Sequence, residues 1–429
     1  MPSSHVKSLL ALCALFMAIP TAQADPTDVQ IRSDAGTLHG TLLLPTTPHH
    51  SKAAALIIAG SGPTDRDGNG PLGGSQNLRQ VAQGLQRCGI ASLRYDKLGV
   101  GASAVPGLDE SSLTMNTFVD DATSALQFLQ QREEFDEVWL VGHSEGGLIA
   151  LAVQADTPAA RIVLLATSSE RYLDILRRQL GDRLPSRLKR AALKALDTLR
   201  AGEPVDDDTL PAQLAPLFRH SVQPFLRSAD ALDPLALIAA IDAPITVVQG
   251  ATDLQVRVAD ARALAERAPN ADVVIIEGMN HVLKHQGGDL TEQTASYGDP
   301  TLPLHPQLLS SLCPPDADLA PAVAAPVAAF NPAIPGDWSG RIKRIGLKVV
   351  FHFTSTDQGL GGTFDSPNQG AFGLPLSLVM EEDGEVTAAS STVGFRFRGS
   401  LRQTKKTWML DGTFEQAGQS FDLKLSKHF

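Results

Sequence analysis

A G-x-S-x-G pentapeptide between two apolar runs constrains the fold of this chain more than any other feature. The run at 138–141 has the length of a buried strand, and the run at 148–153 can continue as a buried helix. Gly142, Ser144 and Gly146 stand between them. This pattern is typical of a strained strand-to-helix turn that exposes a serine hydroxyl, with glycines where side chains would collide. Free backbone N–H groups at the start of the helix would suit an oxyanion.

Strands and helices alternate in the same way over most of the chain up to residue 312. An alternating segment at 28–45, with a turn at Asp34-Ala35-Gly36, predicts a hairpin at the start of this region. The predicted strands are 53–59, 90–95, 162–166, 245–249 and 273–276, and the predicted helices are 78–85, 117–130, 259–267 and 304–312. This alternation indicates an α/β fold with a mostly parallel sheet and right-handed crossovers.

Three other segments depart from this pattern. Residues 168–234 carry leucines at helical spacing and no strand-like run, which predicts a helical cap over the face where the serine lies. Residues 314–335 are rich in Pro and Ala and predict a semi-extended linker between a catalytic domain at 25–313 and a second domain. Residues 336–429 predict a small antiparallel all-β domain, either a half-barrel or a sandwich. Its predicted strands are 342–353, 376–380, 395–398, 408–414 and 421–425, and its predicted turns include 357–359, 382–384 and 416–418.

The first 24 residues have the pattern of a secretory signal peptide. Basic residues precede an apolar run at 9–19, and an A-x-A site at 22–24 precedes Asp25. The run is too short to span a bilayer, which takes about 20 apolar residues. We therefore predict a cleaved signal peptide at 1–24, a mature start near Asp25, and a secreted or periplasmic protein without stable membrane insertion.

The composition limits the kinds of partner that this protein can bind. The formal net charge of −11 argues against nucleic acid and anionic membranes as partners, so we expect a small-molecule substrate. Cys88 and Cys313 remain after removal of the signal peptide. In an oxidising compartment they either form a disulfide or serve as two small buried hydrophobic residues. The oligomeric state stays open.

A nucleophilic serine needs a base that takes its proton and an acid that orients the base. Asp253 follows the predicted strand at 245–249, and His281 follows the predicted strand at 273–276. Carboxyl ends of neighbouring parallel strands share one edge of a sheet, which is where sites in α/β proteins are built. The order Ser, Asp, His is one of the known orders of such triads. The sequence therefore predicts Ser144, Asp253 and His281 as a catalytic triad.

Alternatives exist for two of these residues and for a neighbour. Asp253 could instead cap the helix that follows it, which is a common use of Asp. His285 lies about one helical turn after His281 and could be the base. His143, directly before the serine, is interpreted as a packed residue at the edge of the sheet.

Two backbone N–H groups must bind the oxyanion. Glu145, directly after the nucleophile, supplies one, and the loop after the strand at 53–59 supplies the other. We predict Ser61 for this second donor, with Gly62 as the alternative. The following segment at 65–70 fits the first half of a calcium loop, but its flanks are not helices and the closing carboxylate is missing. It is interpreted as a polar rim of the site, and we expect no metal and no organic cofactor.

These residues together resemble the α/β-hydrolase superfamily. The resemblance rests on the motif at 142–147 with Asp253 and His281, and it is greatest to a bacterial branch described as esterases or serine-aminopeptidase-like proteins. Three further stretches are similar to that branch, at 60–69, 94–97 and 297–300.

The resemblance covers about residues 26–312, and one position departs from it. Leu98 stands where relatives usually carry arginine, which affects the packing of the loop after Asp96. The segments at 336–340 and 365–371 resemble an accessory domain found attached to such hydrolases. The resemblance implies no role for this domain.

The sequence-based hypothesis is a serine hydrolase, a carboxylesterase for short or medium acyl chains that forms an acyl-enzyme intermediate. One alternative is a serine aminopeptidase or dipeptidase, in which carboxylates of the 168–234 segment would bind a free ammonium group. Another alternative is a vestigial hydrolase whose β domain is a ligand-binding module.

Overall fold

The computed structural model describes residues 25–429 except 46, 50–51, 71–72, 207, 209, 287–292, 294–295, 315–329, 357–358, 377, 383, 391–393, 405–406, 417–418 and 429. The predicted signal peptide, most of the predicted linker and parts of the predicted turns in the β domain lie outside these residues. Within the described part of the chain, no helix is both long enough and apolar enough to cross a membrane.

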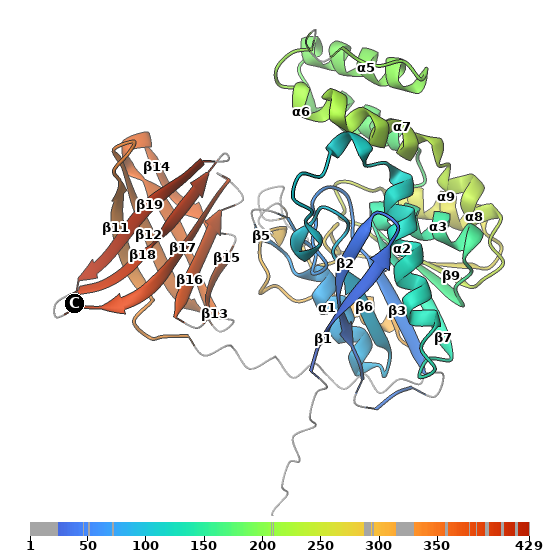
Figure 1. Ribbon diagram of the computed structural model, residues 1–429, viewed down its shortest axis with the longest axis horizontal. Helices are drawn as coiled ribbons and strands as arrows, with labels where there is room; N and C mark the ends of the chain where they lie inside the picture. Colours follow the sequence, from blue (N-terminus) through green and yellow to red (C-terminus); the bar gives the residue numbers. More distant parts are fainter. Residues whose placement is uncertain are drawn as a thin grey trace, which may run out of the picture.

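An eight-stranded sheet forms the centre of the first domain (Figure 1), and its strand order is β1-β2-β6-β3-β7-β8-β9-β10. β1 and β2 form the expected antiparallel hairpin. In the rest of the sheet, β6, β3, β7, β8, β9 and β10 each pair in parallel with the next strand in this order. The predicted α/β fold is confirmed. The strands are β1 (Thr27–Ser33), β2 (Gly36–Leu43), β3 (Ala53–Ile58), β6 (Ala91–Tyr95), β7 (Glu137–His143), β8 (Arg161–Leu165), β9 (Ile245–Gly250) and β10 (Ala271–Ile276). A small separate hairpin joins β4 (Asn69–Gly70) and β5 (Gly73–Gly74).

Helices cover both faces of this sheet because the central strands are apolar on both sides. In β3, Leu56 packs into the core with α2, α3 and α9, whereas Ile57 packs into the core with α1 and α11 on the opposite face. These helices are α1 (Asn77–Arg87), α2 (Met115–Gln130), α3 (Glu145–Asp156), α9 (Val258–Arg267) and α11 (Pro306–Leu312).

The cap segment is helical, as its leucine spacing predicts. It contains α4 (Tyr172–Arg183), α5 (Ser186–Arg200), α6 (Ala215–Phe218) and α7 (Gln223–Ala231). The next helix, α8 (Pro234–Ala239), contributes Ile238 to the core of the α/β domain. Leu173, Leu196, Phe218 and Leu226 are buried in a small core of their own. Figure 1 shows α5, α6 and α7 grouped at one end of the α/β domain.

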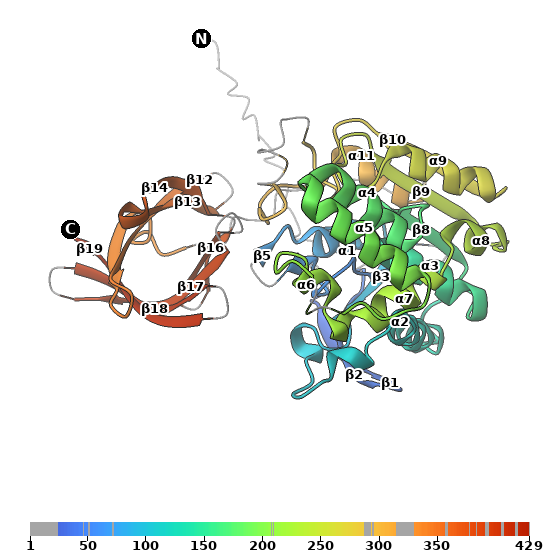
Figure 2. The ribbon, with the colours of Figure 1, turned by 90° about the horizontal axis from the view of Figure 1, so that it is seen from above.

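The second domain is one nine-stranded antiparallel sheet with the order β14-β13-β12-β11-β19-β18-β17-β16-β15. Its strands are β11 (Gly336–Ile342), β12 (Leu347–Thr356), β13 (Gly359–Ser366), β14 (Ala371–Pro375), β15 (Leu378–Glu382), β16 (Glu385–Ser390), β17 (Phe395–Gln403), β18 (Thr407–Gln416) and β19 (Gln419–His428). The sheet curls around an apolar interior (Figure 2), so the half-barrel is confirmed and the sandwich is excluded.

Three expectations for this domain need correction. The predicted strand at 342–353 begins too early, because Ile342 is the last residue of β11, the chain turns at 343–346 with a left-handed φ of 68° at Gly346, and β12 begins at Leu347. β11, β13, β14 and β16 were not predicted, because glycine-rich or short polar stretches hide their alternation. Residues 331–335, expected in the linker, pack on this domain: Ile334 is fully buried and its carbonyl accepts a 2.6 Å hydrogen bond from Trp338 Nε1.

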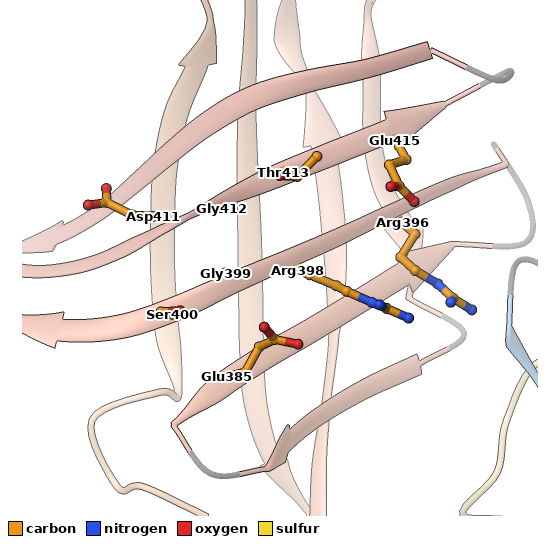
Figure 3. A pocket seen from close by; sticks show the side chains of 9 residues that line it. All are labelled: Glu385, Arg396, Arg398, Gly399, Ser400, Asp411, Gly412, Thr413 and Glu415. Carbon is orange, nitrogen blue, oxygen red and sulfur yellow. The ribbon is translucent and has the colours of Figure 1, made fainter.

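The alternation in β17 separates an aromatic inner face from a charged outer face. Phe395 and Phe397 are buried, whereas Arg396 and Arg398 lie on the outer face. There, β16, β17 and β18 form an open pocket of about 320 Å³ with charged walls (Figure 3). Its lining contains none of the predicted site residues.

Cys88 and Cys313 form a disulfide, with their Cα atoms 5.7 Å apart. Cys88 follows α1 and Cys313 follows α11, so the bond joins two helices on one face of the sheet across 225 residues of sequence. It therefore removes a large loop-closure entropy from the unfolded chain.

We expect the double variant Cys88→Ala/Cys313→Ala to lose about 2–5 kcal/mol of unfolding free energy, because a long loop is no longer closed. Urea unfolding with and without reductant measures this loss. Reductant should destabilise the parent protein and leave the double variant unchanged. An equal response of both proteins would contradict the disulfide.

Candidate active site

The predicted nucleophile lies at the strained turn that the motif indicates. β7 ends at His143, α3 begins at Glu145, and Ser144 between them has a φ of 56°, which is rare outside glycine. The turn fits only because its neighbours are small. A Cβ on Gly142 would lie 2.3 Å from the Gly146 carbonyl oxygen, and a Cβ on Gly146 would lie 2.3 Å from the Ile58 carbonyl oxygen.

The predicted acid and base are brought together by adjacent strands. β9 and β10 pair in parallel, and Asp253 and His281 follow their carboxyl ends. His281 Nδ1 donates to Asp253 Oδ2 at 2.9 Å, and both side chains are buried. A carboxylate can only accept, so Nδ1 carries the proton and Nε2 is left to act as a base.

Asp253 is held as an anion by several donors. The N–H groups of Gln255 and Val256 donate to Oδ1, and Gln249 Nε2 donates to Oδ2 at 3.1 Å. Burial would raise the pKa of Asp253, but the His281 charge and these hydrogen bonds outweigh burial and lower the pKa. The helix-cap alternative does not describe this residue, because α9 has Arg257 at its N-cap.

His143 connects the nucleophile turn to the loop of the base. Its Nε2 donates to the His281 carbonyl oxygen at 2.8 Å, and the two rings lie 5.1 Å apart. Burial and the neighbouring His281 lower the pKa of His143 to about 4, so it is neutral at physiological pH. His143 is therefore packed, as expected, and it also fixes the His281 loop against β7.

The other residues around the imidazole distinguish His281 from His285. Tyr297 lies nearly parallel to the His281 ring, with centroids 6.5 Å apart, and its hydroxyl accepts from Gln255. The His285 ring instead lies against His305.

In the described chain, no hydrogen bond joins the Ser144 hydroxyl to either imidazole, and such bonds often shorten only when substrate binds. The complete triad therefore stays a prediction.

The two predicted oxyanion donors flank the serine. A Cβ on Gly60 would lie 3.3 Å from the Ser144 Cβ, so the loop that carries Ser61 packs directly on the nucleophile. Glu145 is the first residue of α3. No hydrogen bond between described residues uses the N–H of Ser61 or of Glu145, so both are available to a ligand. Gly62 follows directly and remains the alternative.

The segment at 65–70 uses its carboxylates within the protein. Asp65 Oδ1 accepts from the N–H groups of Asp67 and Asn69 at 2.9 and 2.8 Å. Arg94 pairs with Asp67, and Arg66 pairs with Asp96. Among the described residues, no group of three His, Cys, Asp or Glu side chains could bind a metal ion.

Lys284 stabilises the neighbouring loop and was not found from the sequence. Its side chain is fully buried, and Nζ donates to the carbonyl oxygens of Asp299 and Leu302 at 2.8 and 2.5 Å. Burial lowers the pKa of Lys284 to about 7, although Asp299 raises it in part. Gln249 was also missed. The available signal was a glutamine near the end of a buried strand, four positions before the predicted acid.

Comparison with known proteins identifies the family of this chain. A family model described as serine aminopeptidase, S33, matches residues 70–286, just over half of the chain. The esterase EstD of Thermotoga maritima is 25% identical over 239 residues, which cover 54% of this chain and 54% of that protein. The chain therefore spans about half the length of this curated relative.

Solved structures are similar at low identity. The esterase Est1E of Butyrivibrio proteoclasticus with bound ferulic acid has 17% identity and a TM-score of 0.42, covering 62% of this chain and 96% of that chain. The proline iminopeptidase of Mycobacterium smegmatis has 12% identity and a TM-score of 0.41, covering 60% and 92%.

We expect Asp253→Asn to slow labelling of Ser144 by a fluorophosphonate about 10⁴-fold, because the imidazole loses the partner that fixes its tautomer. Labelling rates at saturating probe measure the effect. The control is Asp272→Asn, which changes an exposed carboxylate on β10. Equal labelling rates of the two variants would show that Asp253 is not part of the catalytic site.

Lys284 predicts a pH-dependent contribution to stability. Its pKa is about 7 in the folded state and about 10.4 in an unfolded chain, so the unfolded state binds more protons between these values. The unfolding free energy should therefore rise with pH in this window, by at most about 1.4 kcal/mol per unit. Urea unfolding from pH 7 to 10 should show this rise in the parent relative to Lys284→Met. A difference in unfolding free energy between the two proteins that stays constant across this pH range would refute the lowered pKa of Lys284.

Proposed function

Because this chain belongs to the serine aminopeptidase S33 family of α/β-hydrolases, we propose that it is a carboxylesterase for short or medium acyl chains. The observation that carries the proposal is the His281–Asp253 hydrogen bond at the strand ends beside the Ser144 turn. The similarity to esterase EstD supports ester bonds as the target.

The proposed reaction begins at Ser144. Its hydroxyl attacks the ester carbonyl carbon while His281 Nε2 takes the proton, and the Asp253 carboxylate stabilises the imidazolium that forms. The N–H groups of Ser61 and Glu145 bind the tetrahedral oxyanion. His281 then protonates the leaving alcohol, and water activated by the same imidazole releases the acid from the acyl-enzyme. These steps need no metal or organic cofactor.

Four carboxylates of the cap are engaged in ion pairs, which supports an ester over a free amino terminus at these positions. An aminopeptidase needs a carboxylate that is free to bind the substrate ammonium group. In the described part of the cap, Glu170, Asp174, Asp197 and Asp230 each pair with arginine. The family description nevertheless keeps peptidase activity as the second candidate.

We also propose that the protein acts outside the cytoplasm, as the signal-peptide pattern predicts. The Cys88–Cys313 disulfide supports this location, because disulfides persist in oxidising compartments. The proposed partner is a small-molecule ester, and nucleic acid is not expected.

We expect Ser144→Ala to lower kcat for a p-nitrophenyl acyl ester by about five to six powers of ten with the fold retained, because no nucleophile remains. Ser310→Ala, an exposed serine on α11, is the matched control. A parallel assay with an amino-acid p-nitroanilide separates the candidates. Faster anilide turnover would favour the aminopeptidase, and ester turnover by Ser144→Ala at the parent rate would refute the assignment.

A further inference from the structure

Lys97 is a buried cation beside the nucleophile that the proposed reaction does not use. It follows β6 and is 2% exposed. Its Nζ donates to the Gly60 carbonyl oxygen at 2.6 Å and lies 3.5 Å from Glu145 Oε1. The Phe118 ring lies 5.3 Å from the same Nζ. Burial of an ammonium group costs several kcal/mol unless it is paired, so its position requires a reason.

The Gly60–Ser61 peptide gives that reason. This peptide bond is trans, as are all peptide bonds between described residues. In a trans peptide the C=O and N–H groups point in opposite directions. Because Lys97 binds the Gly60 oxygen, the Ser61 N–H is directed away from Lys97. Ser61 is exposed, and Gly60 packs on the Ser144 Cβ, so the bond to Lys97 decides where this N–H points.

The other member of the ion pair carries the second predicted donor. The Glu145 side chain is 3% exposed, and its own N–H begins α3. Lys97 therefore contacts both Glu145 and the Gly60–Ser61 peptide, the two places whose N–H groups are predicted to bind the oxyanion. The charge on Lys97 also polarises the Gly60–Ser61 peptide, which makes the Ser61 N–H a stronger donor.

We propose that Lys97 is a positioning residue of the oxyanion hole, anchored by Glu145, which orients the Gly60–Ser61 peptide toward the developing negative charge. This inference rests on the proposed ester hydrolysis. It assigns to Lys97 an effect on the transition state and little effect on binding of the planar ester.

The test uses the double variant Lys97→Met/Glu145→Gln. Lys97→Met alone leaves a buried carboxylate without its cation and is expected to be unstable. The double variant removes both charges and keeps similar side-chain volumes. We expect its kcat for a p-nitrophenyl ester to fall about 10²–10³-fold, as when one oxyanion donor is lost, with KM within about twofold.

A trifluoromethyl ketone gives the readout that a purely structural role would not change. It forms a tetrahedral adduct with Ser144 whose oxyanion occupies the same position. We expect its inhibition constant to rise in the double variant by about the same factor as kcat falls. The control, Arg161→Met, removes a partly buried cation at the opposite end of the strands and should change neither value.

The outcomes separate this inference from the proposed function. Parent-like kcat in a folded double variant would overturn the role of Lys97 while ester hydrolysis stands. A loss that appears in KM alone, with the ketone bound as tightly as before, would also overturn it. Absence of ester turnover in the parent protein would instead refute the proposed function.

Discussion

The close approach of three backbones at the start of α3 is the constraint on which the site depends. Gly146 lets the first turn of α3 contact the end of β3, and Gly142 lets β7 pass under that turn. A methyl group at Gly146 would push α3 away from the end of β3, and one at Gly142 would push β7 away from the first turn of α3. The same contact therefore places Ser144, the predicted nucleophile, beside the loop of Ser61 and at the start of α3.

Buried charges complete the arrangement, and each is matched by a specific partner. Asp253 is balanced by His281 and backbone N–H groups, and Lys97 is balanced by Glu145 and the Gly60 carbonyl. Such pairs add little net stability because desolvation offsets their attraction. Their retention is explained by the directions that they impose on an imidazole and on a peptide N–H.

The positions of Asp253 and His281 could be predicted because parallel strands end at one edge of the sheet. The order of strands and helices in the first domain could also be predicted, because apolar residues recur along the sequence at strand or helix spacing. Lys97 could not be predicted, since its role depends on where the Gly60 carbonyl points after folding. The chain turn between Ile342 and Leu347 was missed although Lys343 and Arg344 interrupt the alternation there and Gly346 follows them.

The neutral state of His143 has a consequence for the reaction. In the proposed mechanism His281 becomes an imidazolium, and the His143 ring lies only 5.1 Å away. A second positive charge there would oppose this protonation and weaken the base. Burial and the neighbouring His281 lower the pKa of His143 to about 4, and they outweigh its Nε2–H bond to the His281 carbonyl, which raises the pKa in part. The two histidines can therefore lie side by side, one as a structural donor and the other free to take the serine proton.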